Sequence, residues 1–138
     1  MRHAVCAILI RDTAESREIL LGRRSPSRTS YAGCWDLPGG HVEPHESAIE
    51  ALAREMMEEL GVRPESPRHL ATLEEPDPAR LDVPRYDLYL VTRWSGQPRL
   101  RGDEHDELRW IPVEQAVLMH GLALAGYRAI FAALSRSG

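Results

Sequence analysis

The feature that most restricts the fold is a helical segment at 46–60, with the sequence ESAIEALAREMMEEL. Its apolar residues recur at the spacing of helical turns and would form one stripe that packs against a core. These residues are Ala48, Ile49, Leu52, Met56 and Leu60. Gly61 follows directly, and glycine is the residue that most often ends a helix. We therefore expect an amphipathic helix over 46–60.

The same helix carries acidic residues at positions that destabilise it. Glu55, Glu58 and Glu59 stand three and four residues apart, so they share a face on which like charges cost about a few tenths of a kcal/mol each. Glu58 and Glu59 also lie in the last turn, where the helix dipole favours cations. A bound cation would offset this cost, and ligands made only of oxygen favour Mg²⁺ or Mn²⁺. A solvated acidic face has the same spacing, so the spacing alone leaves both interpretations open.

The acidity of the chain is concentrated around this helix. Between Gly40 and Val62 there are six acidic residues and one basic residue, Arg54, whereas the rest of the chain has 15 acids and 16 bases. A cation site that meets an anionic substrate fits this pattern better than a generally acidic surface does. All 17 basic residues are arginine, and the net charge is −4. Lysine chemistry is therefore excluded, and we expect no nucleic-acid polymer as a partner.

The sequence also bears on the compartment. No segment approaches the roughly 20 apolar residues of a membrane span, and the apolar run Ala4–Ile10 is short for a signal peptide. Cys6 and Cys34 make no disulfide framework and are expected to be reduced. We therefore expect a cytoplasmic protein without a membrane partner.

Apolar runs predict the remaining elements. We expect strands at 4–10, 18–23, 70–73, 85–94 and 108–111, the first two as a hairpin, and further helices at 112–119 and 122–134. The length of 138 residues fits one domain, so 1–138 is assigned to a single domain. Strands on both sides of a central helix, with a helix at the C-terminus, predict an α+β fold. In this α/β/α sandwich a mixed β-sheet lies between helices.

A longer pattern runs through the acidic segment. Gly40 is followed after five residues by Glu46, and after seven more by the run REMMEELGV at 54–62. This order matches the Nudix box, Gx5Ex7REUxEExGU with U an aliphatic residue, at every specified position, so the chain resembles the Nudix hydrolases. The segments ILLGRR at 19–24, WDLPGG at 35–40 and LVTRW at 90–94 are similar to segments of MutT-type members.

The resemblance implies the same sandwich fold and a set of metal ligands for Mg²⁺, with Mn²⁺ as an alternative. The implied ligands are the Gly39 carbonyl and the carboxylates of Glu55, Glu58, Glu59 and Glu104. Glu104 is favoured over the other acids of its loop, which are Asp103, Asp106 and Glu107. Either Glu55 or Glu104 would accept a proton from the attacking water.

Further roles follow from the same resemblance. Arg54 would pair with Glu46 or Glu58 and thereby orient the carboxylates. Substrate contacts are expected first at Arg23, because a guanidinium can clamp phosphate at two points, and then at Arg24, Gly40 and His41.

The expected activity is hydrolysis of a nucleoside triphosphate, oxidised ones included, to the monophosphate and pyrophosphate. The partner would be a small nucleotide, and the protein a monomer or a simple homodimer. An ADP-ribose or nucleotide-sugar pyrophosphatase is an alternative, although such members often carry an additional N-terminal strand region for which the chain leaves no room before Ala4. A non-catalytic Nudix-fold binding module is a second alternative, but such proteins usually lose box carboxylates that this chain retains. The chain has no asparagine, so no asparagine amide can read the base.

Overall fold

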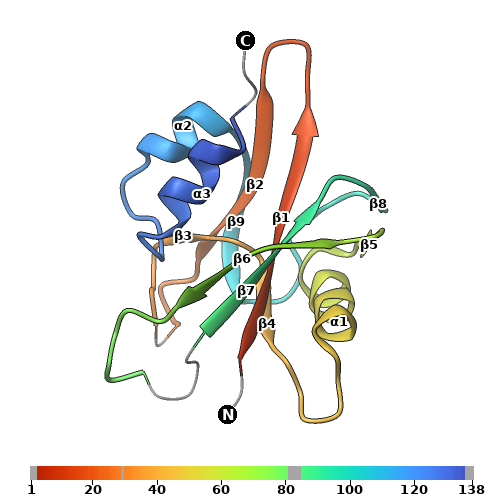
Figure 1. Cartoon of the computed structure of the whole chain (residues 1–138), viewed down its shortest axis with the longest axis vertical. Coiled ribbons are helices and arrows are strands. Elements are labelled where there is room, and N and C mark those ends of the chain that lie inside the picture. The colour runs from red at the N-terminus through yellow and green to blue at the C-terminus, as the bar shows by residue number, and fades with distance from the viewer. Residues whose placement is uncertain (1–2, 29, 81–84, 136–138) are drawn as a thin grey trace.

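In the computed structural model, which describes residues 3–28, 30–80 and 85–135, all of the described strands precede the two C-terminal helices (Figure 1). The strands are β1 (Ala4–Asp12), β2 (Arg17–Arg24), β3 (Trp35–Asp36), β4 (Gly39–His41), β5 (Arg63–Pro64), β6 (Arg68–Glu74), β7 (Arg85–Val91), β8 (Trp94–Ser95) and β9 (His105–Pro112). The helices are α1 (Ala48–Leu60), α2 (Val113–Leu118) and α3 (Tyr127–Ala133). In the described part of the chain, no helix is both long enough and apolar enough to cross a bilayer.

Strand β1 lies at the centre of a mixed sheet. The main path of this sheet runs β3-β2-β1-β7-β6, with β4 paired to β1 and β9 paired to β2. β1 and β7 run parallel, so that Leu9 faces Val91, whereas β1 and β2 form an antiparallel hairpin. Strands β5 and β8 pair separately in a two-stranded sheet. The predicted hairpin and the predicted mixed sheet are both confirmed.

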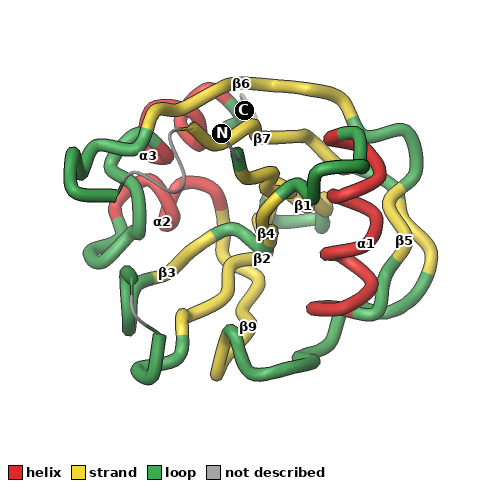
Figure 2. The backbone as a smooth tube through the Cα atoms, turned by 90° about the horizontal axis from the view of Figure 1, so that it is seen from below, coloured by secondary structure: helices red, strands yellow, loops and turns green. Residues whose placement is uncertain are grey.

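The continuous apolar run of β1 has a simple cause, because helices cover both faces of the sheet. Val5, Ala7 and Leu9 pack with α1 in one core cluster, whereas Cys6, Ile8 and Ile10 pack with α2 and α3 in the other. Side chains along a strand point alternately to the two faces, so a strand buried on both sides is apolar throughout. Figure 2 shows α1 on one side of the strands and α2 and α3 on the other. The α/β/α arrangement is thus confirmed.

The central helix begins two residues later than expected. Ser47 caps it, since its hydroxyl accepts from the Glu50 N–H at 3.1 Å while Glu50 accepts from the Ser47 N–H at 2.8 Å. Glu46 therefore lies outside the helix and is able to meet Arg54. The predicted apolar stripe is wrong at Ile49, which is 44% exposed, and Ala51 is buried in its place.

Two other predicted elements are too long. The strand predicted over 85–94 ends at Val91, because Trp94 belongs to β8 and stacks on Trp110 with ring centroids 5.9 Å apart. The helix predicted over 122–134 covers only 127–133. Its expected first turn instead runs beside β3, where Trp35 donates to the Gly121 carbonyl and accepts from the Ala123 N–H, both at 2.8 Å.

Candidate active site

Two glycines allow β4 to approach both β1 and α1 closely. Gly39 pairs with Cys6 and Gly40 with Val5. A Cβ atom at residue 39 would lie 2.0 Å from the carbonyl oxygen of Val5, and one at residue 40 would lie 2.4 Å from the carboxyl carbon of Glu55. Because no other residue lacks a Cβ, the pair of glycines is what places this strand directly beside the acidic face of the helix.

Arg54 connects the segment before α1 to that acidic face. Its guanidinium donates two bonds to Glu46, of 2.7 and 2.9 Å, and one of 3.0 Å to the carbonyl oxygen of His41. It also reaches Glu55 at 2.9 Å and Glu58 at 3.4 Å. The bonds from Arg54 lower the pKa of Glu46 to about 2, so this pair stays ionised. Arg54 thus contacts both of the acids expected as its partners, and it fixes the position of Glu55.

The carboxylate of Glu59 is buried without a hydrogen-bond donor. Glu59 is 6% exposed, and neither of its oxygens accepts a hydrogen bond from the described residues. His105 is 5% exposed, with Nδ1 3.5 Å from Oε1 of Glu59, and its Nε2 also has no partner there. Burial, together with the neighbouring carboxylates of Glu104 and Glu55, raises the pKa of Glu59 well above its usual value. A buried carboxylate is costly unless a proton or a cation neutralises it, so this position suits a bound cation.

The donor set around Glu59 fits a divalent cation. Glu59, Glu104 and His105 each offer one ligand atom, and these atoms lie within 4.8 Å of one another. Carboxylate oxygens suit Mg²⁺ and Mn²⁺, and an imidazole nitrogen suits Mn²⁺ better than Mg²⁺. His105 is not predicted from the sequence, although its position next to Glu104 is a signal. Gly22 makes room for the imidazole, because a Cβ there would lie 2.7 Å from its Cδ2 atom.

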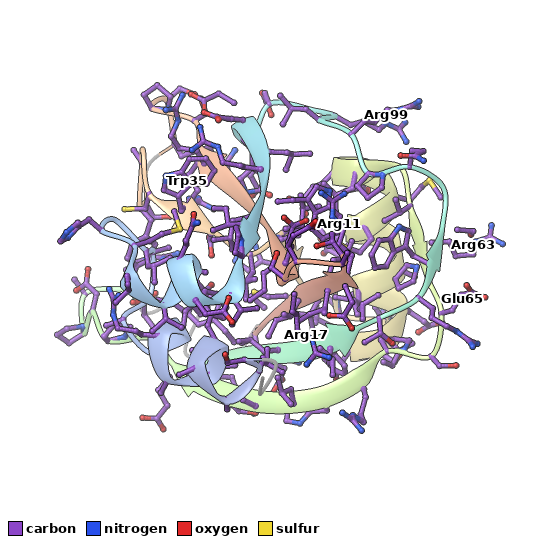
Figure 3. All side chains as sticks on the ribbon, turned by 90° about the horizontal axis from the view of Figure 1, so that it is seen from above. Arg11, Arg17, Trp35, Arg63, Glu65 and Arg99 are labelled. Atoms are coloured by element: carbon purple, nitrogen blue, oxygen red, sulfur yellow. The ribbon has the colours of Figure 1, made fainter. Side chains whose placement is uncertain are left out.

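The segment that carries Glu104 and His105 is attached to the end of α1. The backbone N–H of Arg99 donates to the Leu60 carbonyl at 3.1 Å, and that of Arg101 donates to the Glu59 carbonyl at 3.0 Å. Arg99 lies at the rim of the molecule (Figure 3). At its other end, the Glu104 carbonyl accepts from the backbone N–H of Ser25 at 3.0 Å. These bonds bring Glu104 to the helix despite their separation in the sequence.

A cleft of about 270 Å³ opens beside the carboxylates. The sequence-predicted residues that line it are Arg24, Gly39, Gly40, His41, Glu55 and Glu104. Of the four acids considered in the 103–107 segment, all of them described, Glu104 alone is in the lining, whereas Asp106 and Glu107 contact Arg23. Glu59 is buried and does not line the cleft, and the Glu58 side chain is 58% exposed. The predicted site residues are therefore divided between the cleft wall, a buried position at Glu59 and an exposed position at Glu58.

The two neighbouring arginines of β2 point in different directions. Arg24 lines the cleft, where its Nε donates to the Ser30 carbonyl at 2.8 Å. Arg23 instead donates to Asp106 at 2.9 Å and is not part of the lining. Successive side chains of a strand alternate between its two faces, so only one of the pair can face the cleft.

Comparisons with known proteins show the family to which the chain belongs. The family model described as NUDIX domain matches residues 1–134. The CTP pyrophosphohydrolase of Escherichia coli (strain K12) is 34% identical over 117 residues, which are 85% of this chain and 80% of that protein. A putative 8-oxo-dGTP diphosphatase of Bacillus subtilis is 33% identical over 70% of this chain and 59% of its own length. The crystal structure of a MutT Nudix hydrolase from Burkholderia pseudomallei superposes with a TM-score of 0.79 at 32% identity, over 95% of each chain. The chain therefore belongs to the Nudix hydrolase family, which acts on phosphorus-containing anhydrides.

Proposed function

We propose that the protein hydrolyses nucleoside triphosphates to the monophosphate and pyrophosphate with a bound divalent cation. The observation that carries this proposal is the buried side chain of Glu59, which accepts no hydrogen bond from the described residues and lies close to the cleft-lining Glu55 and Glu104. Binding alone does not need this costly arrangement, because a nucleotide can be held by arginines and backbone amides, so the cluster favours hydrolysis over binding alone.

The residues have separate roles in this proposal. The Gly39 carbonyl and the carboxylates of Glu55, Glu58, Glu59 and Glu104 hold Mg²⁺, or Mn²⁺ in its place. When bound, the cation neutralises phosphate charge and lowers the pKa of water. Glu55 and Glu104 both line the cleft, so either carboxylate is placed to accept the proton of the attacking water. Arg54 holds Glu55 in position through its 2.9 Å bond.

The substrate phosphates would meet Arg24. Its guanidinium lies 3.5 Å from Asp36 and 3.9 Å from Glu104, and its bond to the Ser30 carbonyl further restricts it. A restrained guanidinium at the cleft wall loses little entropy when it binds an anion. We therefore assign the main phosphate contact to Arg24 rather than Arg23, with Gly40 and His41 on the same wall.

The relatives support a triphosphate substrate. The names of the Escherichia coli and Bacillus subtilis relatives specify CTP and 8-oxo-dGTP, which are both nucleoside triphosphates. We therefore place CTP and oxidised dGTP first among the candidates. ADP-ribose and nucleotide sugars contain the same diphosphate linkage and are the alternative.

A product-release screen tests the proposal. Purified protein with Mg²⁺ is incubated with ordinary and oxidised nucleoside triphosphates, ADP-ribose and nucleotide sugars, and the nucleoside monophosphate, phosphate and pyrophosphate released are measured separately. We expect pyrophosphate from triphosphates, abolished by exhaustive chelation and restored by Mg²⁺ or Mn²⁺. The Glu59→Gln variant serves as the inactive control. Full activity after chelation, or turnover of ADP-ribose alone, would overturn the proposal.

A further inference from the structure

The cleft has a second wall that the carboxylate chemistry does not use. Tyr31, Arg80 and Tyr86 line the same cleft as Glu55 and Glu104. They come from separate parts of the chain: Tyr31 follows β2, Arg80 follows β6, and Tyr86 lies in β7. Two aromatic rings and a guanidinium therefore stand in one cavity with the proposed catalytic groups.

Glu75 holds these three side chains from behind. Its side chain is 2% exposed and does not line the cleft. The hydroxyls of Tyr31 and Tyr86 donate to its two different oxygens, and Arg80 donates to it at 3.0 Å. Arg80 also donates to the Tyr86 hydroxyl at 3.2 Å, and its Cζ lies 5.4 Å from the centre of the Tyr31 ring. One buried carboxylate thus fixes the position of the entire wall.

The backbone at Tyr31 adopts a strained conformation, which the contacts of the Tyr31 side chain maintain. Its φ angle is +55°, in the left-handed region that bulky side chains rarely adopt. Such strain persists only where the surrounding structure enforces it, and it gathers at functional sites. Here the bond to Glu75 and the contact with Arg80 hold the ring at the cleft.

The protonation states of Glu75, Tyr31 and Tyr86 keep their hydrogen bonds in place at neutral pH. Although burial acts to raise it, the pKa of Glu75 is lowered overall by the bonds from Tyr31 and Tyr86, so the carboxylate stays ionised. Burial and the bond to Glu75 raise the pKa of Tyr31 to about 12, and they raise that of Tyr86 as well. Both hydroxyls therefore remain donors at neutral pH, committed to Glu75.

We propose that Tyr31, Tyr86 and Arg80 form a stacking platform for the nucleobase, with Glu75 as its positioning residue. The inference rests on the proposed function, because it presupposes a nucleotide in the cleft. Since the tyrosine hydroxyls are committed to Glu75, the rings offer their faces and edges rather than hydrogen bonds. Base–aromatic stacking is tolerant of base identity, and a guanidinium adds to it. The platform therefore supplies affinity for a base and little discrimination among bases.

Binding without turnover tests the platform. Calorimetry with Mg²⁺ measures the Kd of α,β-methylene CTP, of α,β-methylene GTP and of inorganic tripolyphosphate, which has no base. We expect Tyr31→Ala and Arg80→Ala to weaken binding of both nucleotides about tenfold, a change within the range of base stacking. Tripolyphosphate binding should stay within about twofold of wild type, as expected for a residue that contacts only the base. Glu75→Gln should raise KM for nucleotides while leaving kcat near wild type.

Arg109→Ala is the matched control. Arg109 also lies over an aromatic ring, with Cζ 5.2 Å from the centre of Trp35, but it is outside the cleft lining. The Arg109→Ala substitution should change neither the Kd of the nucleotide analogues nor that of tripolyphosphate. Arg80→Ala keeps the test decisive if Tyr31→Ala fails to fold, which circular dichroism would reveal. Equal losses for nucleotide and tripolyphosphate, or no loss at all, would overturn the platform. A wild-type protein that binds no nucleotide would instead overturn the proposed function, and the platform with it.

Discussion

Replacing Gly40 with alanine perturbs the site without removing any of its functional groups. The added Cβ would lie 2.4 Å from the carboxyl carbon of Glu55 and 2.5 and 2.6 Å from its oxygens. Ordinary van der Waals contact begins at 3.4 Å, so the carboxylate must retreat by about 1 Å. The same retreat disrupts the 2.9 Å bond from Arg54.

We expect this displacement to lower kcat by about 100-fold, because misplacing a catalytic group by about 1 Å has an effect of this size. The loss corresponds to about 2.7 kcal/mol of transition-state stabilisation. The fold should survive, since the crowded atoms are at the end of a side chain that can rotate away. The melting temperature should therefore stay within about 4 °C of wild type, which corresponds to about 1 kcal/mol.

The assay combines pyrophosphate release with thermal melting followed by circular dichroism. Gly39→Ala is the matched control, because its Cβ would meet the Val5 carbonyl oxygen at 2.0 Å and the Cys6 Cα at 2.8 Å. These backbone atoms of β1 cannot rotate away, so we expect a loss of about 2 kcal/mol or more, or roughly 8 °C. Wild-type kcat in Gly40→Ala, or melting as early as in Gly39→Ala, would refute the reasoning.

Three further predictions concern the carboxylates and their partners. The pKa of Glu59 is raised in the folded, metal-free protein. The folded state is therefore most stable where Glu59 is protonated, and this stability is lost as the pH rises above 4.5, the pKa of Glu59 in the unfolded chain. In chelator, wild type should therefore lose melting temperature relative to Glu59→Gln between pH 5 and 8, and parallel curves would contradict this. His105→Gln should weaken Mn²⁺ binding, measured by electron paramagnetic resonance, more than Mg²⁺ binding measured by calorimetry; equal losses would show that His105 only positions Glu59. Arg54→Lys should lower kcat about tenfold or more, because lysine cannot make the two-point bond to Glu46; an unchanged kcat would exclude a positioning role.

The helix and its carboxylates were predictable because their pattern is local. The spacing predicts one shared face for Glu55, Glu58 and Glu59, and the side chains of Glu55 and Glu59, one turn apart, do lie together. It does not predict that Glu58 is largely exposed while Glu59 is almost fully buried. The sheet against which the helix packs decides which of its acidic residues is buried, and the helix sequence does not contain that information.

Other parts of the site depend on contacts between distant segments. The choice between Arg23 and Arg24 follows from which face of β2 points to the cleft, and this is fixed by its pairing with β9. The helix predicted over 122–134 fails at its start, because residues 121–123 hydrogen-bond with Trp35 instead. Local propensity is a weak prior where a strand edge offers the backbone other partners. Glu75 similarly shows its role only once the fold brings Tyr31 to it.

The segment that carries Glu104 docks on the acidic end of α1. Glu58 and Glu59 oppose the helix dipole, and the last turn contains no basic residue. The compensation comes from outside the helix, where Arg101 donates from its backbone to the Glu59 carbonyl and from its side chain to the Met57 carbonyl at 2.9 Å. Three residues further along, the same segment delivers Glu104 to the cleft. Stabilisation of the helix end and completion of the proposed cation site thus depend on the same docked segment, because the bonds that satisfy the last carbonyls of α1 also fix the position of Glu104.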